Sequence, residues 1–120
     1  MGTVVTYLKQ SYLEYNSRYF RGRLPKDCRV IYSDLSKLRY MGAHKATTKD
    51  GDRKNSKHII WIDHKLRWSN KLVDMTLLHE MVHLKLFKKY GHEVPRGLHG
   101  PLFQKEMKRL AKVGAFNRLW

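Results

Sequence analysis

The spacing of apolar residues along the chain predicts three helices. Residues 3–20 form an amphipathic pattern in which apolar positions recur every three or four residues: Val4, Val5, Leu8, Tyr12, Tyr15 and Tyr19. A long apolar segment predicts a second helix, which begins at Ser69 or Asn70 as its cap and runs to about Tyr90. Residues 101–112 begin with a proline, which favours the first turn of a helix, and have an inward face made of Phe103, Met107 and Leu110.

Three shorter segments between the first two helices predict strands, over residues 28–35, 38–47 and 57–63. The polar turn that precedes the third strand contains Asp50-Gly51, a strong hairpin signal. In the third strand, Ile59 and Trp61 alternate with Ile60 and Ile62, so both faces can be covered. The same strand is also a candidate sheet edge for pairing with an extended substrate.

The order of these elements predicts the fold class. A helix, three strands, a helix, a loop and a final helix indicate an α+β fold in which helices pack on a small, largely antiparallel, three-stranded sheet. A chain of 120 residues fits one domain, so residues 1–120 are expected to form a single unit.

The second predicted helix contains TLLHEMVHLKLF, residues 76–87, where ionisable side chains interrupt an apolar run. Burying such groups is costly unless something pairs with them. His79 and His83 are four residues apart, so they project from one helix face about 6 Å apart and can bind one zinc ion. Glu80 then points beside the metal, where it can take a proton from an activated water. This HExxH spacing is typical of zinc peptidases, and only about 0.013 chance matches are expected in a chain of this composition.

A peptidase site of this kind needs a third protein ligand and one open position. Four residues downstream are candidates: His92, Glu93, His99 and Glu106. The pattern HExxHxxGxxH is excluded because Leu86 and Lys89 occupy its glycine and third histidine positions. His99 lies between two glycines just before the last helix, and the loop that leads to it can span up to about 26 Å, enough to return to the histidine pair. These features favour His99, with Glu106 on the last helix as the alternative.

The net charge of the chain indicates which partners to expect. Lys and Arg number 25 and Asp and Glu number 10, which gives a net charge of +15. Such a field favours polyanions, so DNA is an expected partner, whereas the absence of an apolar run of about 18 residues argues against a membrane span. The basic residues cluster around the hairpin and on the expected solvent face of the last helix: Lys45, Lys49, Arg53, Lys54 and Lys57, then Lys105, Lys108, Arg109 and Lys112.

Several segments together resemble the SprT-like zinc metallopeptidases, the family of the DNA–protein crosslink protease Spartan. YLEYNSRYFRGRLP resembles the family's first helix and its Asn-x-x-Tyr-Phe-x-x-x-Leu-Pro segment, and the glycine in YMGAHK resembles that of its second strand. TLLHEMVHLKLF resembles its zinc helix, and GLHGPLFQKEMKRL its His-Gly-x-x-Phe segment. The resemblance implies a small zincin-like fold in which zinc is bound by His79, His83 and His99, with Glu80 as the general base.

Many members of that family carry a C-terminal zinc ribbon built from cysteines. Cys28 is the single cysteine of this chain, so it can form neither such a ribbon nor an internal disulfide, and a minimal catalytic domain is expected. The N-terminus lacks a signal-peptide pattern. A monomer in the cytoplasm, close to DNA, is the resulting expectation.

The predicted activity is zinc-dependent hydrolysis of peptide bonds, with proteins or peptides as substrates and DNA-associated proteins among them. One rival is a nucleic-acid-binding module with a structural zinc ion, although such a site does not need Glu80. The other is a zinc hydrolase that acts on a non-peptide bond. Four residues are candidates for a second oxyanion donor, and the sequence does not choose among them: Tyr40, His44, His92 and Arg96.

Overall fold

A computed structural model of the 120-residue chain describes residues 7–35, 37, 41–47, 57–90 and 100–116. The elements follow in the order α1 (Tyr7–Tyr19), β1 (Arg29–Ser33), β2 (Gly42–Thr47), β3 (Lys57–Asp63), the 3-10 helix η3 (His64–Trp68), α2 (Asn70–Tyr90) and α3 (Pro101–Lys112). The predicted α+β fold is therefore confirmed. The expected start of the first helix and the hairpin turn at residues 49–56 lie outside the described residues.

The sheet has the strand order β1-β3-β2 and is mixed. β2 runs antiparallel to β3, with Gly42 opposite Ile62, whereas β1 runs parallel to β3, with Val30 opposite Ile60. The prediction of a largely antiparallel sheet was wrong for β1, because the intervening β2 returns the chain to the end where β1 began. The prediction of an edge at β3 was also wrong, since β3 is central and has a partner on each side.

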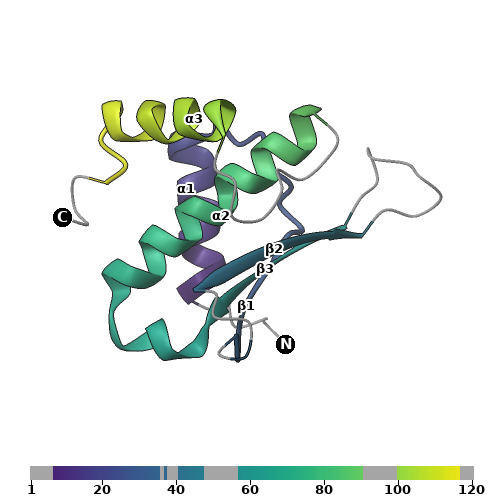
Figure 1. Ribbon diagram of the computed structural model, residues 1–120, viewed down its shortest axis with the longest axis vertical. Coiled ribbons are helices and arrows are strands. Elements are labelled where there is room, and N and C mark those ends of the chain that lie inside the picture. Colours follow the sequence, from purple (N-terminus) through teal and green to yellow (C-terminus); the bar gives the residue numbers. More distant parts are fainter. Residues whose placement is uncertain (1–6, 36, 38–40, 48–56, 91–99, 117–120) are drawn as a thin grey trace.

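One face of the sheet is covered by α1 and α2, and α3 packs across α2 (Figure 1). On β3 the inward residues Ile60 and Ile62 are fully buried, while Ile59 and Trp61 on the other face are only half-buried. The expected alternation is present, although the second face is less covered than the first. Among the helices that the structure describes, none is long and apolar enough to cross a membrane.

Helix α2 supplies the largest part of the core. Its fully buried side chains lie on successive turns: Val73, Leu77, Leu78, Met81, Val82 and Leu84. Complete burial of one such side chain stabilises the fold by about 1.5–3 kcal/mol, so this helix is firmly held in place. The backbone N–H of Leu72 donates to Ser69 Oγ at 3.4 Å, which supports Ser69 as the cap. The buried face of α2 is thereby positioned in the core.

The turn after α1 is closed by one buried asparagine. Asn16 Nδ2 donates to the Leu24 carbonyl at 2.9 Å, and the Leu24 N–H donates to Asn16 Oδ1 at 3.0 Å. The Asn16 carbonyl also accepts from the N–H of Gly22 at 2.8 Å, and Gly22 has a positive φ of 69° that suits glycine. Tyr12 adds a hydrogen bond to the Pro25 carbonyl at 2.5 Å. These contacts give a physical reason for the spacing of Asn, Leu and Pro in NSRYFRGRLP.

A buried carboxylate joins α1 to α2. Asp74 accepts hydrogen bonds from the Tyr15 hydroxyl at 2.9 Å and from the Tyr7 hydroxyl at 3.0 and 3.1 Å. Burial raises the pKa of Asp74, and the two tyrosine hydroxyls, which lower it, only partly offset that effect. The contact fixes the first half of α2 against the N-terminal helix.

Candidate metal centre

The two histidines of α2 are arranged as a pair of metal ligands. His79 Nε2 and His83 Nε2 lie 3.3 Å apart, and the ring planes are inclined by 65°. Two nitrogens that bind a tetrahedral zinc ion at about 2.05 Å are separated by about 3.3 Å, so the separation of the pair matches that of two zinc ligands. The donor type fits as well, because imidazole is a common zinc ligand.

Glu80 lies beside this pair and is covered by the sheet. Its carboxylate Oε2 is 4.0 Å from His79 Nε2, and its side chain is 8% exposed, compared with 31% for His79. The cover comes from Gly42 on β2: a Cβ atom placed there would lie 3.2 Å from Glu80 Cγ and 2.6 Å from Thr76 Cγ2. Only glycine lets β2 approach α2 this closely. The carboxylate therefore lies between the sheet and the more open histidine.

Phe103 closes another side of the histidine pair. Its ring centroid lies 4.9 Å from that of His79 and 4.8 Å from that of His83, and the side chain is buried. The first turn of α3 is therefore placed beside both imidazoles. His99, the predicted third ligand, lies outside the described residues, so its role stays a prediction.

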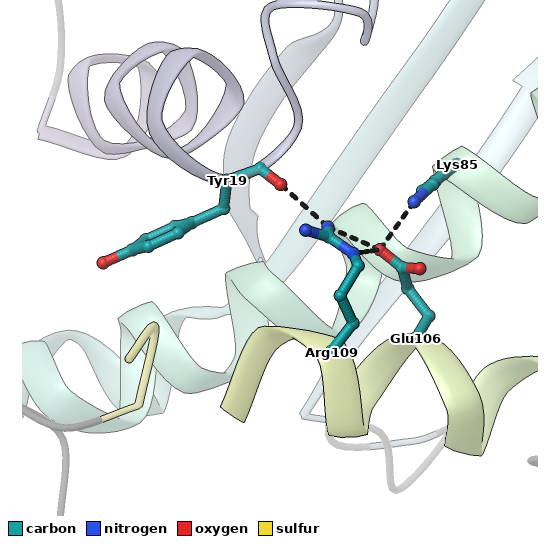
Figure 2. A network of polar contacts seen from close by, with 4 residues as sticks. All are labelled: Tyr19, Lys85, Glu106 and Arg109. Carbon is teal, nitrogen blue, oxygen red and sulfur yellow. Dashed lines mark hydrogen bonds and ion pairs between the residues drawn. The ribbon is translucent and has the colours of Figure 1, made fainter. Parts of the chain in front are cut away.

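Glu106, the alternative third ligand, is held in an ion-pair network (Figure 2). Its Oε1 accepts from Lys85 Nζ at 2.8 Å and from Arg109 Nε at 2.8 Å, and Arg109 also donates to the Tyr19 carbonyl at 2.7 Å. Burial raises the pKa of Glu106, but the hydrogen bonds from Arg109 and Lys85 outweigh it and hold that pKa below its ordinary value. The carboxylate thus ties α3 to α2, and through Arg109 to the end of α1.

The same network corrects one expectation about the last helix. Lys105, Lys108 and Lys112 are exposed as predicted, but Arg109 is half-buried and turns inward to Glu106. Of the four candidates for a second oxyanion donor, the structure describes His44 alone. This side chain is buried, and its Nε2 lies 3.0 Å from His58 Nδ1, which does not test the role. The other three candidates fall outside the described residues.

A second group of potential metal ligands lies at the ends of β1 and β3. The ligand atoms of Asp34, Asp63 and His64 lie within 4.8 Å of one another. Asp63 already caps η3 by accepting from the Lys65 N–H at 3.5 Å, and Asp34 is exposed. The spacing is wider than that of His79 and His83, and exposed acidic groups of this kind are common without a metal, so the α2 pair is the stronger candidate.

Comparison with known proteins places the chain in a family. No curated protein gives a significant match. The model of the SprT-like family matches residues 8–118, which include α1, the sheet, α2 and α3. The matched range covers nearly the whole length of the chain and includes Asn16, Gly42 and the histidine pair. The chain belongs to the SprT-like family.

Proposed function

We propose that this protein is a zinc-dependent metallopeptidase. The observation that carries the proposal is the geometry on α2: two imidazole nitrogens 3.3 Å apart, with a buried carboxylate 4.0 Å from one of them. A pair of histidines at this separation matches one zinc ion, and a carboxylate beside it matches a general base. Membership of the SprT-like family is compatible with such an activity.

His99 is proposed as the third ligand. Phe103 contacts both imidazole rings, so the start of α3 lies beside the pair. Residue 99 is four positions before Phe103, and four residues span at most about 14 Å, which keeps His99 within reach of the site. Glu106 is less suited to the role, because Lys85 and Arg109 already bind its Oε1.

The residues around the site have distinct chemical tasks. Zinc, when bound, would lower the pKa of a water molecule to about 7 and polarise the substrate carbonyl. Glu80 would accept the proton of that water and pass it to the leaving amine. Its burial under Gly42 limits access of bulk water, which strengthens electrostatic effects at the carboxylate. His79 and His83 would hold the ion through their Nε2 atoms, which lie 3.3 Å apart.

The sheet offers a place for the substrate chain. Among the described strands, β2 pairs only with β3, so its other edge presents N–H and C=O groups. An extended peptide can add to such an edge as a further strand. Gly42 is the first residue of β2, and a Cβ atom placed there would lie 3.2 Å from Glu80 Cγ, so this strand begins next to the proposed base. This assignment replaces β3 as the substrate-binding strand.

A Glu80→Gln substitution tests the proposal. The variant should retain one zinc ion and the thermal stability of the parent, while peptide cleavage falls by about 10²–10⁴, since Gln has nearly the same shape but cannot accept the proton. Glu14→Gln is the matched control, because Glu14 is exposed on α1 and forms a surface ion pair with Arg18. Zinc is measured by mass spectrometry and cleavage with an unstructured protein substrate.

The outcomes of this experiment separate the rival functions. Parental cleavage by the Glu80→Gln variant would exclude Glu80 as the base. Bound zinc with no cleavage of any peptide by the parent would favour a structural zinc in a nucleic-acid-binding module or a hydrolase for another bond. Absence of zinc from the purified parent, and failure to bind added zinc, would refute the metal site itself.

A further inference from the structure

Two buried histidines lie on the sheet and take no part in the proposed metal centre. His44 on β2 and His58 on β3 are each 5% exposed, and His44 Nε2 lies 3.0 Å from His58 Nδ1. In the strand register, His44 lies opposite Ile60 and Ala46 lies opposite His58, so both rings are on the inward face of the sheet, like Ile60. We call these two residues the sheet histidines.

The rings of the sheet histidines meet end to end and not face to face. Their planes are inclined by only 14°, and their centroids lie 5.2 Å apart. With the two nitrogens 3.0 Å apart, a centroid separation this large requires both nitrogens to lie close to the line that joins the ring centres. The lone pair or N–H bond of an imidazole nitrogen points away from its ring centre, so those of His44 Nε2 and His58 Nδ1 point at each other. This is the geometry of a nearly straight N–H···N hydrogen bond.

Such an arrangement fits a proton and not a metal ion. A metal on the line between the two nitrogens would lie only about 1.5 Å from each, whereas zinc binds an imidazole nitrogen at about 2.0–2.1 Å. His79 and His83 differ, because their nitrogens are 3.3 Å apart while their centroids are only 5.0 Å apart and their planes are inclined by 65°. Their lone pairs do not point along the line between the nitrogens and can meet at an ion beside it. Both of those rings also contact Phe103 of α3.

The contact between the sheet histidines holds one proton. In the neutral pair one of the two facing nitrogens donates and the other accepts, whichever tautomers are present. The donor ring can take up a further proton on its outer nitrogen, since a cationic imidazole still donates to a neutral one. One more proton would place N–H groups on both facing nitrogens, 3.0 Å apart and directed at each other. The doubly cationic pair must therefore separate.

The charged side chains of the neighbouring strands do not favour extra protons on the sheet histidines. Lys45 on β2 and Arg29 on β1 both lie opposite Ile59, on the outer face of the sheet, and both are exposed. Lys57, the residue before His58, is exposed and forms an ion pair with Asp27 at 2.9 Å. Cations near an imidazole oppose its protonation, and burial opposes it as well.

Helix α2 places an aromatic ring and a carboxylate on this side of the sheet. The centroid of Phe87 lies 6.0 Å from that of His44 and 5.4 Å from that of the other sheet histidine, with the rings inclined by 66° and 78°. Glu80 lies against Gly42, which precedes His44 by two residues on the same face of β2, whereas Asp74 of α2 faces α1. The negative charge of Glu80 favours one added proton, but it cannot relieve the contact between two opposed N–H groups.

We propose that His44 and His58 form a pH-sensitive latch that holds β2 in place beside the proposed base. The N–H···N bond is present while the pair is neutral or carries one positive charge. Histidine ordinarily changes charge between about pH 5 and 8, so the bond is present above this range and is lost as pH falls through it. Its loss separates the rings under Phe87 and loosens the part of β2 that follows Gly42. The latch is a property of the sheet and does not depend on peptidase activity.

Amide hydrogen exchange in the full zinc-loaded chain tests the latch. Protection of the β2 amides that bind β3 is measured at about pH 7.5 and 5, with correction for the intrinsic effect of pH on exchange. The parent should lose about tenfold or more of its protection in acid, since one withheld proton changes an opening equilibrium about tenfold per pH unit. His58→Gln should lose less than about threefold, because the amide oxygen of Gln accepts from cationic His44 and stays neutral. His64→Gln is the matched control: His64 lies on η3 with its side chain 41% exposed, and this variant should behave as the parent does.

Scalar coupling between isotope-labelled nitrogens of His44 and His58 reports the hydrogen bond itself, and it should be present at neutral pH and absent in acid. Absence of the coupling at neutral pH would overturn the proposal. So would unchanged protection of β2 in acid, equal acid sensitivity in His58→Gln, or loss of that sensitivity in His64→Gln. Zinc content is measured at each pH, because release of zinc would affect the parent and both variants alike. If His58→Gln fails to fold, His44→Gln gives the same comparison with donor and acceptor exchanged.

Discussion

Substitution of Gly42 by alanine tests how tightly β2 and α2 are packed at the proposed site. A Cβ atom on residue 42 would lie 2.6 Å from Thr76 Cγ2, 3.1 Å from the Trp61 carbonyl oxygen and 3.2 Å from Glu80 Cγ. The first distance is well below van der Waals contact. Thr76 is buried between α2 and the sheet, so its methyl group has little space into which it can turn away. The strand or the helix must shift.

The size of the effect follows from two opposing terms. Overpacking of this kind costs about 1–3 kcal/mol. Alanine offsets about 0.5–1 kcal/mol of that cost, because it restricts the unfolded chain more than glycine does. The net loss in the free energy of unfolding should be about 0.5–2 kcal/mol, which corresponds to roughly 2–8 °C in melting temperature for a domain of this size. Displacement of Glu80 should also lower peptide cleavage, by tenfold or more.

A double-mutant cycle tests the contact between residue 42 and Thr76 directly. Thr76→Ser removes the methyl group that the new Cβ would meet at 2.6 Å, so Gly42→Ala should cost less in that background, with a coupling energy of at least about 0.5 kcal/mol. Gly100→Ala is the spatial control, since no heavy atom in the described part of the chain, apart from its neighbours in sequence, lies within 4 Å of a Cβ there. Urea unfolding gives all four free energies of the cycle. Strict additivity of the two changes, or a Gly42→Ala variant as stable as the parent, would refute the packing argument.

Three further predictions concern single side chains. His99→Ala should abolish zinc binding while Glu106→Ala retains it, as measured by mass spectrometry. Loss of zinc from Glu106→Ala and its retention by His99→Ala would make Glu106 the third ligand instead. Glu106→Gln should lower the free energy of unfolding by about 1–3 kcal/mol at neutral pH. Because the pKa of Glu106 is lowered, its contribution to stability is present above the ordinary pKa of 4.5 and is lost as pH falls through the folded pKa. The free energies of unfolding of the variant and the parent, measured in urea, should therefore become equal in acid. Asp74→Asn should show the opposite dependence on pH. Because the pKa of Asp74 is raised, its contribution to the stability of the parent is present below pH 3.8 and is lost as pH rises through the folded pKa, so the free energy of unfolding of the variant should rise relative to that of the parent.

The helices and the histidine pair could be predicted because their information is local. The spacing of apolar residues on α2 and the four-residue separation of His79 and His83 depend on one continuous helix. Strand pairing, in contrast, depends on residues that are far apart in the sequence. β1 pairs with a strand that begins 28 residues after it starts, and nothing in its five residues selects a parallel neighbour. The mixed sheet was therefore missed, and with it the central position of β3.

The charged residues of α3 show a second limit of prediction from the sequence. Glu106 and Arg109 belong to a helix face that looks polar in sequence, so the pattern predicted a solvent face for Arg109. Their inward direction depends on Lys85, which faces them from α2, and on the Tyr19 carbonyl at the end of α1. The spacing of Lys85, Lys88 and Lys89 did contain a signal, since residues three and four apart share a helix side. Only the packing of three helices shows that this side lines a pocket between them.

The cost of burying ionisable groups connects these observations. Asp74 is buried on α2 and receives two tyrosine hydroxyls, while Glu106 is buried on α3 and receives an ammonium and a guanidinium. In each case the donors explain why the carboxylate is tolerated, and the two resulting pKa shifts differ in sign because hydroxyl groups are neutral and the cations are not. His79, Glu80 and His83 raise the same question on a third side of the structure. A zinc ion is the compensation that their separation and donor types fit, so removal of zinc by a chelator should lower the melting temperature of the parent and of Glu80→Gln alike, whereas loss of the Asp74 or Glu106 contacts should not alter the zinc content.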